Sequence, residues 1–274
     1  MPKKIKGALR KAFEARKPAM AFLKRKSRKM KRLFGNEQGK GYTFAITCVK
    51  KPVYIRMAID NANSLHYLNA NHSFVIYADA VCHEEFKRLR HKLDYPARVE
   101  CHDDFGTVKG PWQYCKVETI IDAGRKGFVF TDADGIWHDE PRIDPEKITI
   151  LVLAYAIKDK PLEKRTAEAL FKEQGAVDLN HYVLGFLFVP PSMMTEALAN
   201  DIQRFSGILL EDPLAFLESE EDRRTIHRLA DELGVSIALQ THYKDIRTLK
   251  QNDGPKSREL LQSLYYGCKN DIIS

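Results

Sequence analysis

Cysteine is scarce in this 274-residue sequence, which has five, an odd number, with no pair at C-x-x-C spacing. This composition argues against a disulfide framework or a zinc ribbon and favours a reducing compartment. Long apolar runs are also missing from residues 1–35, so we expect no secretory signal. The longest apolar runs, 148–157 and 182–189, are too short to span a bilayer and are typical of buried strands.

Acidic residues are almost absent from the first 35 positions, where 14 Lys or Arg residues stand against a single acid, Glu14. This segment therefore carries a charge of +13, and the net +7 of the whole chain leaves −6 for the remainder. The chain is thus a mildly acidic body with a strongly basic arm.

The arm also carries apolar residues at helical spacing on both sides of Pro18, which is expected to kink or divide the helix. Such a pattern is typical of a helix that lies on an anionic membrane, where each basic residue contributes about 1 kcal/mol. Nucleic-acid binding, docking on the body and a solvated arm are the alternatives. The apolar residues are Ile5, Leu9, Ala12, Phe13, Met20, Leu23, Met30 and Phe34.

After a polar break at residues 35–39, apolar strands alternate with helices, which predicts βαβ units and a largely parallel sheet. Ligands of such sheets bind at the carboxyl ends of the strands, where Asp79, Asp132 and Asp134 fall. Further along, we expect a helix over 222–234 and a strand over 235–240. The first expected strands span 42–49, 72–79, 97–102 and 127–134, with helices over 52–69, 83–93 and 111–123 between them.

Two carboxylates end the expected strand 127–134. Side chains alternate along a strand, so Asp132 and Asp134 should face the same way and Ala133 the other. Neighbouring carboxylates repel each other unless a cation lies beside them. Magnesium or manganese would fit, with phosphate oxygens and water completing the shell. A solvated turn, in which Asp and Gly are common, is the simpler alternative.

These stretches resemble a known family. The sequence from about residue 41 to residue 250 resembles GT-A glycosyltransferases, which use nucleotide sugars. YTFAITCV resembles their nucleotide-binding start, and FVFTDADGIW their metal-binding Asp-x-Asp strand. LGFLFVPPS resembles the strand of their second half, and LQTHYKDIRTLK the closing His-x-x-Gly-x-x-Lys element of retaining, glycogenin-like (family 8-like) members.

The resemblance implies a Rossmann-like GT-A fold with a mixed, mostly parallel central sheet flanked by helices. It divides the chain into an arm, 1–38, a glycosyltransferase domain, 39–250, and a C-terminal tail, 251–274. Two positions depart from the family pattern. Val183 stands where an Asn usually contacts the sugar, and Asp245 stands where a Gly usually approaches the phosphate.

The metal site implied by the resemblance holds Mn²⁺ or Mg²⁺. In it Asp134 binds the metal directly, Asp132 contacts the metal or the ribose, and His242 supplies a further ligand. A neutral imidazole can join two carboxylates on manganese. A structural or merely exposed histidine is the alternative for His242.

The donor site implied by the resemblance takes residues from three elements. Asp79 would hydrogen-bond a uracil, and Lys116 would reach the donor diphosphate or sugar and assist catalysis. Thr47 and Val49 would contact the base mainly through their backbone. The alternatives are a helix N-cap at Asp79 and a solvated helix lysine at Lys116.

Sugar transfer passes through an oxocarbenium-like state, so stabilising the leaving diphosphate matters most. An inverting enzyme would also need a carboxylate base. Glu221 and Asp222 are the candidates, although acids in a first helical turn also favour the helix dipole. Glu211 and Asp212 share this ambiguity. His138, just past the acid pair, is a candidate to face the acceptor, and retention or inversion stays open.

The sequence therefore favours a metal-dependent glycosyltransferase that moves a sugar from a UDP-sugar to a glycan or lipid-linked acceptor, on the cytoplasmic face of a membrane. The first alternative is a haloacid-dehalogenase-like phosphatase with Asp132 as nucleophile and Asp134 as acid/base. That motif normally opens its fold, whereas three strand–helix units precede it here. The second is a nucleic-acid-binding protein, but the body lacks a basic stripe interleaved with aromatics, so no nucleic acid is expected.

Overall fold

The computed structural model describes residue 21 and residues 41–137, 141, 143–152, 154–156, 161–170, 180–182, 184–211, 217, 219–250 and 261–263. The basic arm apart from residue 21, His138, Val183 and Asp212 lie outside these residues. The chain forms two compact units. The first unit comprises Met1–Thr107, Thr131–Arg142 and Gln251–Ser274, and the second comprises Val108–Phe130 and Ile143–Lys250.

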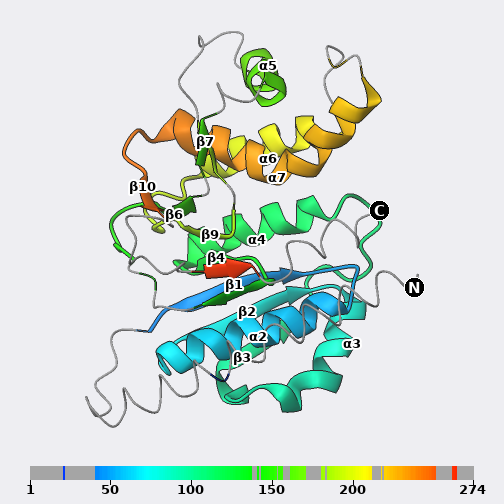
Figure 1. Ribbon diagram of the computed structural model, residues 1–274, viewed down its shortest axis with the longest axis vertical. Coiled ribbons are helices and arrows are strands. Elements are labelled where there is room, and N and C mark those ends of the chain that lie inside the picture. Colours follow the sequence, from blue (N-terminus) through cyan, green and yellow to red (C-terminus); the bar gives the residue numbers. More distant parts are fainter. Residues whose placement is uncertain are drawn as a thin grey trace. The chain divides into compact units, whose positions relative to one another are not determined.

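The main sheet has seven strands in the order β10-β6-β9-β4-β1-β2-β3 (Figure 1). Its pairs β1–β2, β2–β3 and β10–β6 are parallel, and β6–β9 is antiparallel. The expected α/β fold with a mixed, mostly parallel sheet flanked by helices is therefore confirmed. Within the described ranges no helix has the length and apolarity needed to cross a bilayer.

The first unit contains three parallel strands with connecting helices, as the sequence predicts. In chain order its elements are β1 (Thr43–Cys48), α2 (Val53–Leu68), β2 (Ser73–Ala78), α3 (Ala80–Leu89), two short 3₁₀ helices (Arg90–Lys92 and Pro96–Arg98) and β3 (Val99–His102). Buried apolar residues in β1, among them Phe44 and Ile46, form its core. Two short strands complete the unit, β5 (Gly135–Trp137) and the antiparallel β11 (Leu261–Ser263), so residues expected in a tail pair with the segment after the acids.

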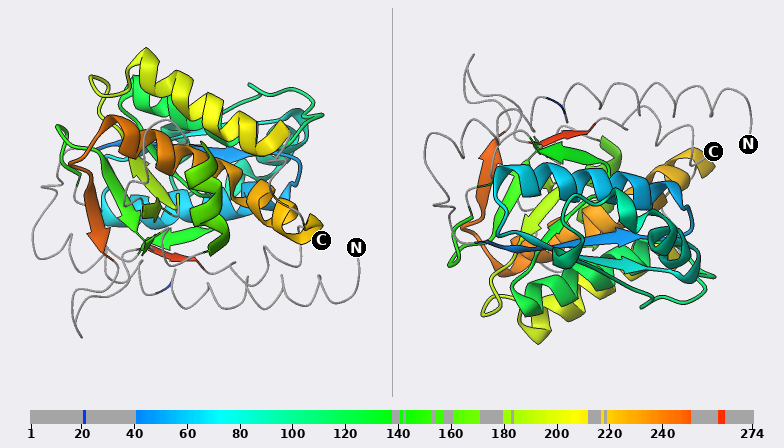
Figure 2. Two further views of the ribbon diagram at one scale, coloured as in Figure 1. Left: turned by 90° about the horizontal axis from the view of Figure 1, so that it is seen from above. Right: turned by 90° about the horizontal axis from the view of Figure 1, so that it is seen from below.

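The second unit is mainly helical around short strands. Its elements are α4 (Gln113–Lys126), β4 (Val129–Thr131), β6 (Thr149–Val152), β7 (Ala154–Ala156), α5 (Pro161–Leu170), β8 (Asn180–Tyr182), β9 (Phe186–Phe188), α6 (Glu196–Glu211), α7 (Glu220–His242) and β10 (Arg247–Lys250). Helices α6 and α7 lie side by side (Figure 2). A glycine ends α4, because Gly127 has a left-handed φ of +68°, and the chain turns directly into β4.

Two local predictions differ from the structure. Residues 235–240 belong to α7 rather than to a strand, because residues on all sides of this part of the helix are buried and a short apolar run does not distinguish a buried helix from a buried strand. The strand expected over 127–134 ends at Thr131, and Ala133 and Asp134 form a turn before β5. The acid pair therefore lies just past the strand end, where strict alternation of side chains no longer applies.

Candidate functional site

The acid pair occupies a tight connection between two short strands. Asp134 is only 4% exposed, Ala133 is buried and Asp132 is half-buried. Burying a carboxylate is costly unless it is hydrogen-bonded or paired with a cation. The buried Asp134 does not belong to a solvated turn, and the pair lies at strand ends, where α/β sheets bind their ligands.

Helix α2 holds this connection through two buried polar side chains. The Asn61 Nδ2 donates to the Asp132 carbonyl oxygen at 2.8 Å, and the Asn61 Oδ1 accepts from the Trp137 indole Nε1 at 3.2 Å. The Ser64 Oγ accepts from the Trp137 backbone N–H at 3.1 Å and donates to the Asn61 carbonyl at 2.7 Å. The Trp137 ring, fully buried, meets Phe44 edge-on with ring centroids 6.1 Å apart. Both ends of the segment 132–137 are thus attached to α2.

Asp79 follows β2 and caps α3, as one of the two interpretations of the sequence expected. Its Oδ1 accepts from the Cys82 backbone N–H at 2.9 Å, and its Oδ2 accepts from the Lys50 backbone N–H at 2.6 Å. Lys50 has a left-handed φ of +66°, and the Lys51 N–H bonds back to the Val49 carbonyl at 2.8 Å. Such three-residue turns are strained, so Asp79 holds the loop after β1 in an unusual conformation.

The end of β1 lies close to two of the candidate carboxylates. Burial raises the pKa of the Cys48 thiol well above its usual value, and two other thiols and the charges of Asp79 and Asp132 raise the pKa further. Both carboxylates therefore lie within electrostatic reach of the carboxyl end of β1. At the same place the Thr47 Oγ1 is buried without a hydrogen-bond partner among the described residues.

Lys116 is a buried cation rather than a solvated one. Its Nζ lies 3.0 Å from the Asp231 Oδ2, 3.9 Å from the Glu232 Oε1 and 5.7 Å from the centroid of the Phe130 ring. The solvated alternative for Lys116 is therefore wrong. Asp231 and Glu232 were not predicted as partners of Lys116, although an acid between the buried positions Ala230 and Leu233 of a helix indicates a buried partner.

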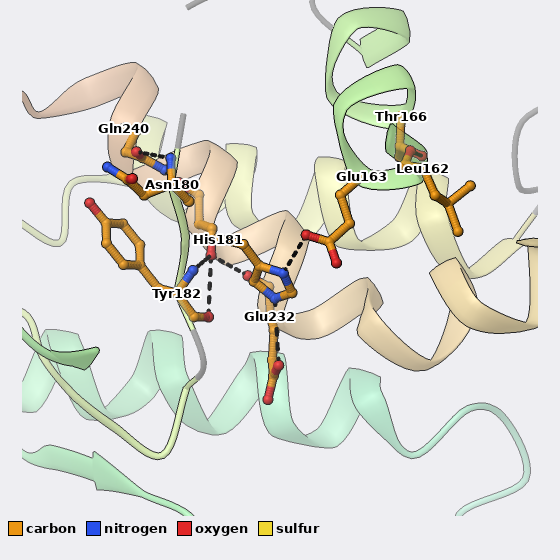
Figure 3. A network of polar contacts seen from close by, with 9 residues as sticks. Leu162, Glu163, Thr166, Asn180, His181, Tyr182, Glu232 and Gln240 are labelled. Carbon is orange, nitrogen blue, oxygen red and sulfur yellow. Dashed lines mark hydrogen bonds and ion pairs between the residues drawn. The ribbon is translucent and has the colours of Figure 1, made fainter. Parts of the chain in front are cut away.

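Glu232 also belongs to a histidine-centred network in the second unit (Figure 3). The His181 Nδ1 lies 2.9 Å from the Glu163 Oε2, and the His181 Nε2 lies 3.6 Å from the Glu232 Oε2, an ion-pair distance. Figure 3 shows the two carboxylates on opposite sides of the imidazole ring. Burial lowers the pKa of His181, but the contacts with Glu163 and Glu232 outweigh burial and raise the pKa to about 9. His181 is therefore protonated at neutral pH and joins α5 to α7.

His242, the expected third metal ligand, ends α7 and contacts a carboxylate of α6. Its Nε2 lies 2.8 Å from the Asp201 Oδ2. Burial raises the pKa of Asp201, but the bonds from His242 and Arg204 outweigh this and lower the pKa overall. A metal-binding role for His242 would use its other ring nitrogen, Nδ1, because metal-bound histidines commonly donate their second N–H to a carboxylate such as Asp201.

The candidate bases lie at the exposed start of α7. Glu221 and Asp222 occupy the first helical turn, where the Ser219 Oγ accepts from the Asp222 N–H at 3.0 Å. Asp222 lies 3.8 Å from Arg165, and Glu211 accepts from the Tyr114 hydroxyl at 2.8 Å. Glu221 and Asp222 thus complement the N-terminus of α7, whereas Glu211 is the last residue of α6.

A divalent ion fits the donor set at the acid pair. In the described part of the chain no three His, Cys, Asp or Glu side chains gather into a complete metal site. Magnesium and similar ions commonly use one or two carboxylates, with substrate phosphates and water as the other ligands. Asp132 and Asp134 on one anchored turn match that requirement.

No protein-family model and no curated protein matches the sequence of the chain. Solved structures with a similar fold include several glycosyltransferases. GlyE of Streptococcus pneumoniae TIGR4 is 12% identical, with a TM-score of 0.43, over 77% of this chain and 45% of its own. The galactosyltransferase LgtC, in complex with donor and acceptor sugar analogues, is 8% identical over 84% of this chain and 94% of its own, with a TM-score of 0.49.

The mannosyltransferase PcManGT of Pyrobaculum calidifontis, in complex with GDP-Man and Mn²⁺, is 13% identical over 86% of this chain and 85% of its own, with a TM-score of 0.31. The present chain spans less than half the length of the GlyE chain. At these identities and TM-scores, a proposal of function depends on the residues of this chain rather than on the similar structures.

Proposed function

We propose that the protein is a metal-dependent glycosyltransferase that moves a sugar from a UDP-sugar to a glycan or lipid-linked acceptor. The observation that supports this most strongly is the pair Asp132 and Asp134 on a turn anchored to α2 at the end of β4. Asp79 and the end of β1 lie near Asp132 in the same unit. Such a group of carboxylates at strand ends suits a nucleotide whose phosphates carry a divalent ion.

In this proposal each residue has a defined task. Asp134 and Asp132 hold Mn²⁺ or Mg²⁺, which when bound neutralises charge that develops on the leaving diphosphate. The backbone of Thr47 and Val49 and the carboxylate of Asp79 bind the nucleoside. Because Asp79 also orders the loop after β1, it contributes to nucleotide binding indirectly as well.

The other candidate residues could act only under particular conditions. Lys116 would have to exchange its partner Asp231 for the diphosphate. His242 would bind the metal through Nδ1 while its Nε2 keeps the contact with Asp201. Glu221 and Asp222 are the candidate bases if the reaction inverts the sugar carbon, whereas retention needs no such base.

The order of the elements along the chain argues against the phosphatase alternative. Three strand–helix units, β1–α2, β2–α3 and β3–α4, precede β4 in the structure. A phosphatase of the haloacid-dehalogenase type would have Asp132 after its first strand, so the observed order favours the transferase.

Thermal unfolding with millimolar UDP, with and without Mn²⁺, tests the proposed function. Ligand at about 100 times its dissociation constant stabilises the folded state by about 2.7 kcal/mol, so UDP with Mn²⁺ should raise the melting temperature, and UDP alone should raise it less. A panel of UDP-sugars, scored for release of UDP, then identifies the donor. No shift with any nucleoside diphosphate, together with hydrolysis of para-nitrophenyl phosphate, would favour the phosphatase instead.

A further inference from the structure

Asn61 is a fully buried polar residue of α2 whose side chain uses both ends of its amide on one segment. The amide nitrogen donates to the Asp132 carbonyl at 2.8 Å, and the amide oxygen accepts from the Trp137 indole at 3.2 Å. The two partners bracket Asp134 in the sequence. A buried amide with both ends bonded is strongly oriented, because an alternative rotamer would leave buried groups unpaired.

We propose that Asn61 is a positioning residue of the metal site, an inference that depends on the proposed function. The bond to the Asp132 carbonyl fixes the plane of the peptide between Asp132 and Ala133. That plane sets the direction from which the Asp132 and Asp134 side chains leave the turn. Two carboxylates held at a fixed separation bind an ion without first being brought together against their mutual repulsion.

The same helix provides a matched control two residues away. Asn63 is also buried, and its amide is also bonded at both ends. Its Nδ2 donates to the Lys92 carbonyl at 3.1 Å, and its Oδ1 accepts from the Asp94 N–H at 2.9 Å. Asn63 therefore anchors a different loop, before β3, and loss of its amide should weaken the fold without disturbing the acid pair.

The experiment compares Asn61→Ala with Asn63→Ala in the full chain. At saturating UDP, Mn²⁺ is titrated and the rise in melting temperature gives the half-saturating metal concentration. Groups that orient a metal ligand typically change metal affinity by about 10- to 100-fold when removed, so Asn61→Ala should raise this concentration at least 10-fold. Asn63→Ala should leave the concentration within about twofold of wild type, although both variants melt earlier.

Each outcome separates the inference from the proposed function. Equal metal dependence in the two variants, with a normal response of the wild type, overturns the role of Asn61 and leaves the proposed function standing. Absence of any metal-dependent UDP response in the wild type overturns both. If Asn61→Ala does not fold, Asn61→Ser and Asn63→Ser replace the pair, since a serine hydroxyl can bond within its own helix. The same 10-fold contrast is then expected.

Discussion

At the scale of single residues, Asp79 carries two backbone hydrogen bonds that connect α3 with the loop after β1. Removing both acceptors in Asp79→Ala should lower the free energy of unfolding by about 2.5–4 kcal/mol, because a cap contributes about 1 kcal/mol and a bond to a charged group about 1.5–3 kcal/mol. Asp79→Asn should lose less, since the amide oxygen still accepts one bond. Urea denaturation of the two variants measures the difference, and equal losses would contradict it.

Asp134 offers a test at the proposed metal site itself. Asp134→Asn preserves the shape of the side chain but removes the charge that a divalent ion requires. We expect turnover to fall at least 100-fold, since removing a single stabilising group in a reaction commonly costs about 10²–10³ in rate. The variant should have a normal circular dichroism spectrum. Near wild-type turnover at limiting metal would remove Asp134 from the mechanism.

At the scale of elements, the packing of α6 against α7 depends on the close approach of Gly234 to Ser206. A Cβ at Gly234 would lie 2.3 Å from the Ser206 Oγ and 2.7 Å from the Ser206 backbone nitrogen. Gly234→Ala should destabilise the protein by about 1–2 kcal/mol, because the overpacking exceeds the helix-propensity gain of about 1 kcal/mol.

Gly207, also in α6, is the control for that substitution. Among the residues that the structure describes, a Cβ at Gly207 would meet only the Tyr114 hydroxyl, at 4.0 Å. Gly207→Ala should therefore stabilise the protein by about 0.5–1 kcal/mol. Thermal melting compares the two changes, and a stabilising Gly234→Ala would show that the helices can move apart.

The contacts of His181 in β8 with Glu163 in α5 and Glu232 in α7 predict that stability depends on pH. The pKa of His181 in the folded protein, about 9, is above its unfolded value of about 6.5. The contribution of His181 is therefore complete below pH ~6.5 and is lost as the pH rises through about 9. The free energy of unfolding should fall by at most about 3 kcal/mol over this pH range.

His181→Gln isolates this contribution, because glutamine is polar but cannot carry the charge. Urea unfolding of the wild type and the variant between pH ~6 and ~9.5 measures the difference between their free energies of unfolding. This difference should be large at low pH and small at high pH. A difference that does not change with pH would mean that Glu163 and Glu232 do not hold the proton.

At the scale of the whole molecule, charge is strongly divided between the first 35 residues, at +13, and the remainder. We propose that the arm places the enzyme on the cytoplasmic face of a membrane, beside a lipid-linked or other membrane-bound acceptor. The intact protein should sediment with anionic vesicles, and part of this binding should resist salt because apolar residues also insert.

A chain that begins near Gly39 is the comparison for the arm. It should still respond to UDP and Mn²⁺, because Asp79, Asp132 and Asp134 lie beyond the arm, but it should not sediment with vesicles. Equal sedimentation of both forms, or of neither, would exclude the membrane role. Retention of nucleic acid by the intact form alone would then identify a different partner for the arm.

Much of the fold could be predicted because its signals are local. Apolar runs of strand length, Pro52 at a helix start and turns between the segments specify β1, β2, β3 and the helices between them. The acids at 79, 132 and 134 could be placed at the sheet edge for the same reason. The sequence by itself therefore determined the α/β class and the position of the candidate site along the chain.

Only the tertiary structure decided which side chains meet. Residues 235–240 became part of α7 because packing on all sides, with Gly234 against Ser206, overrides their strand-like composition. The contact between Asn61 and Asp132 joins residues 71 positions apart. A hydrogen bond requires the donor–acceptor distance to lie within a range of a few tenths of an ångström. Folding brings these atoms together, and no local pattern of residue types encodes such a distance.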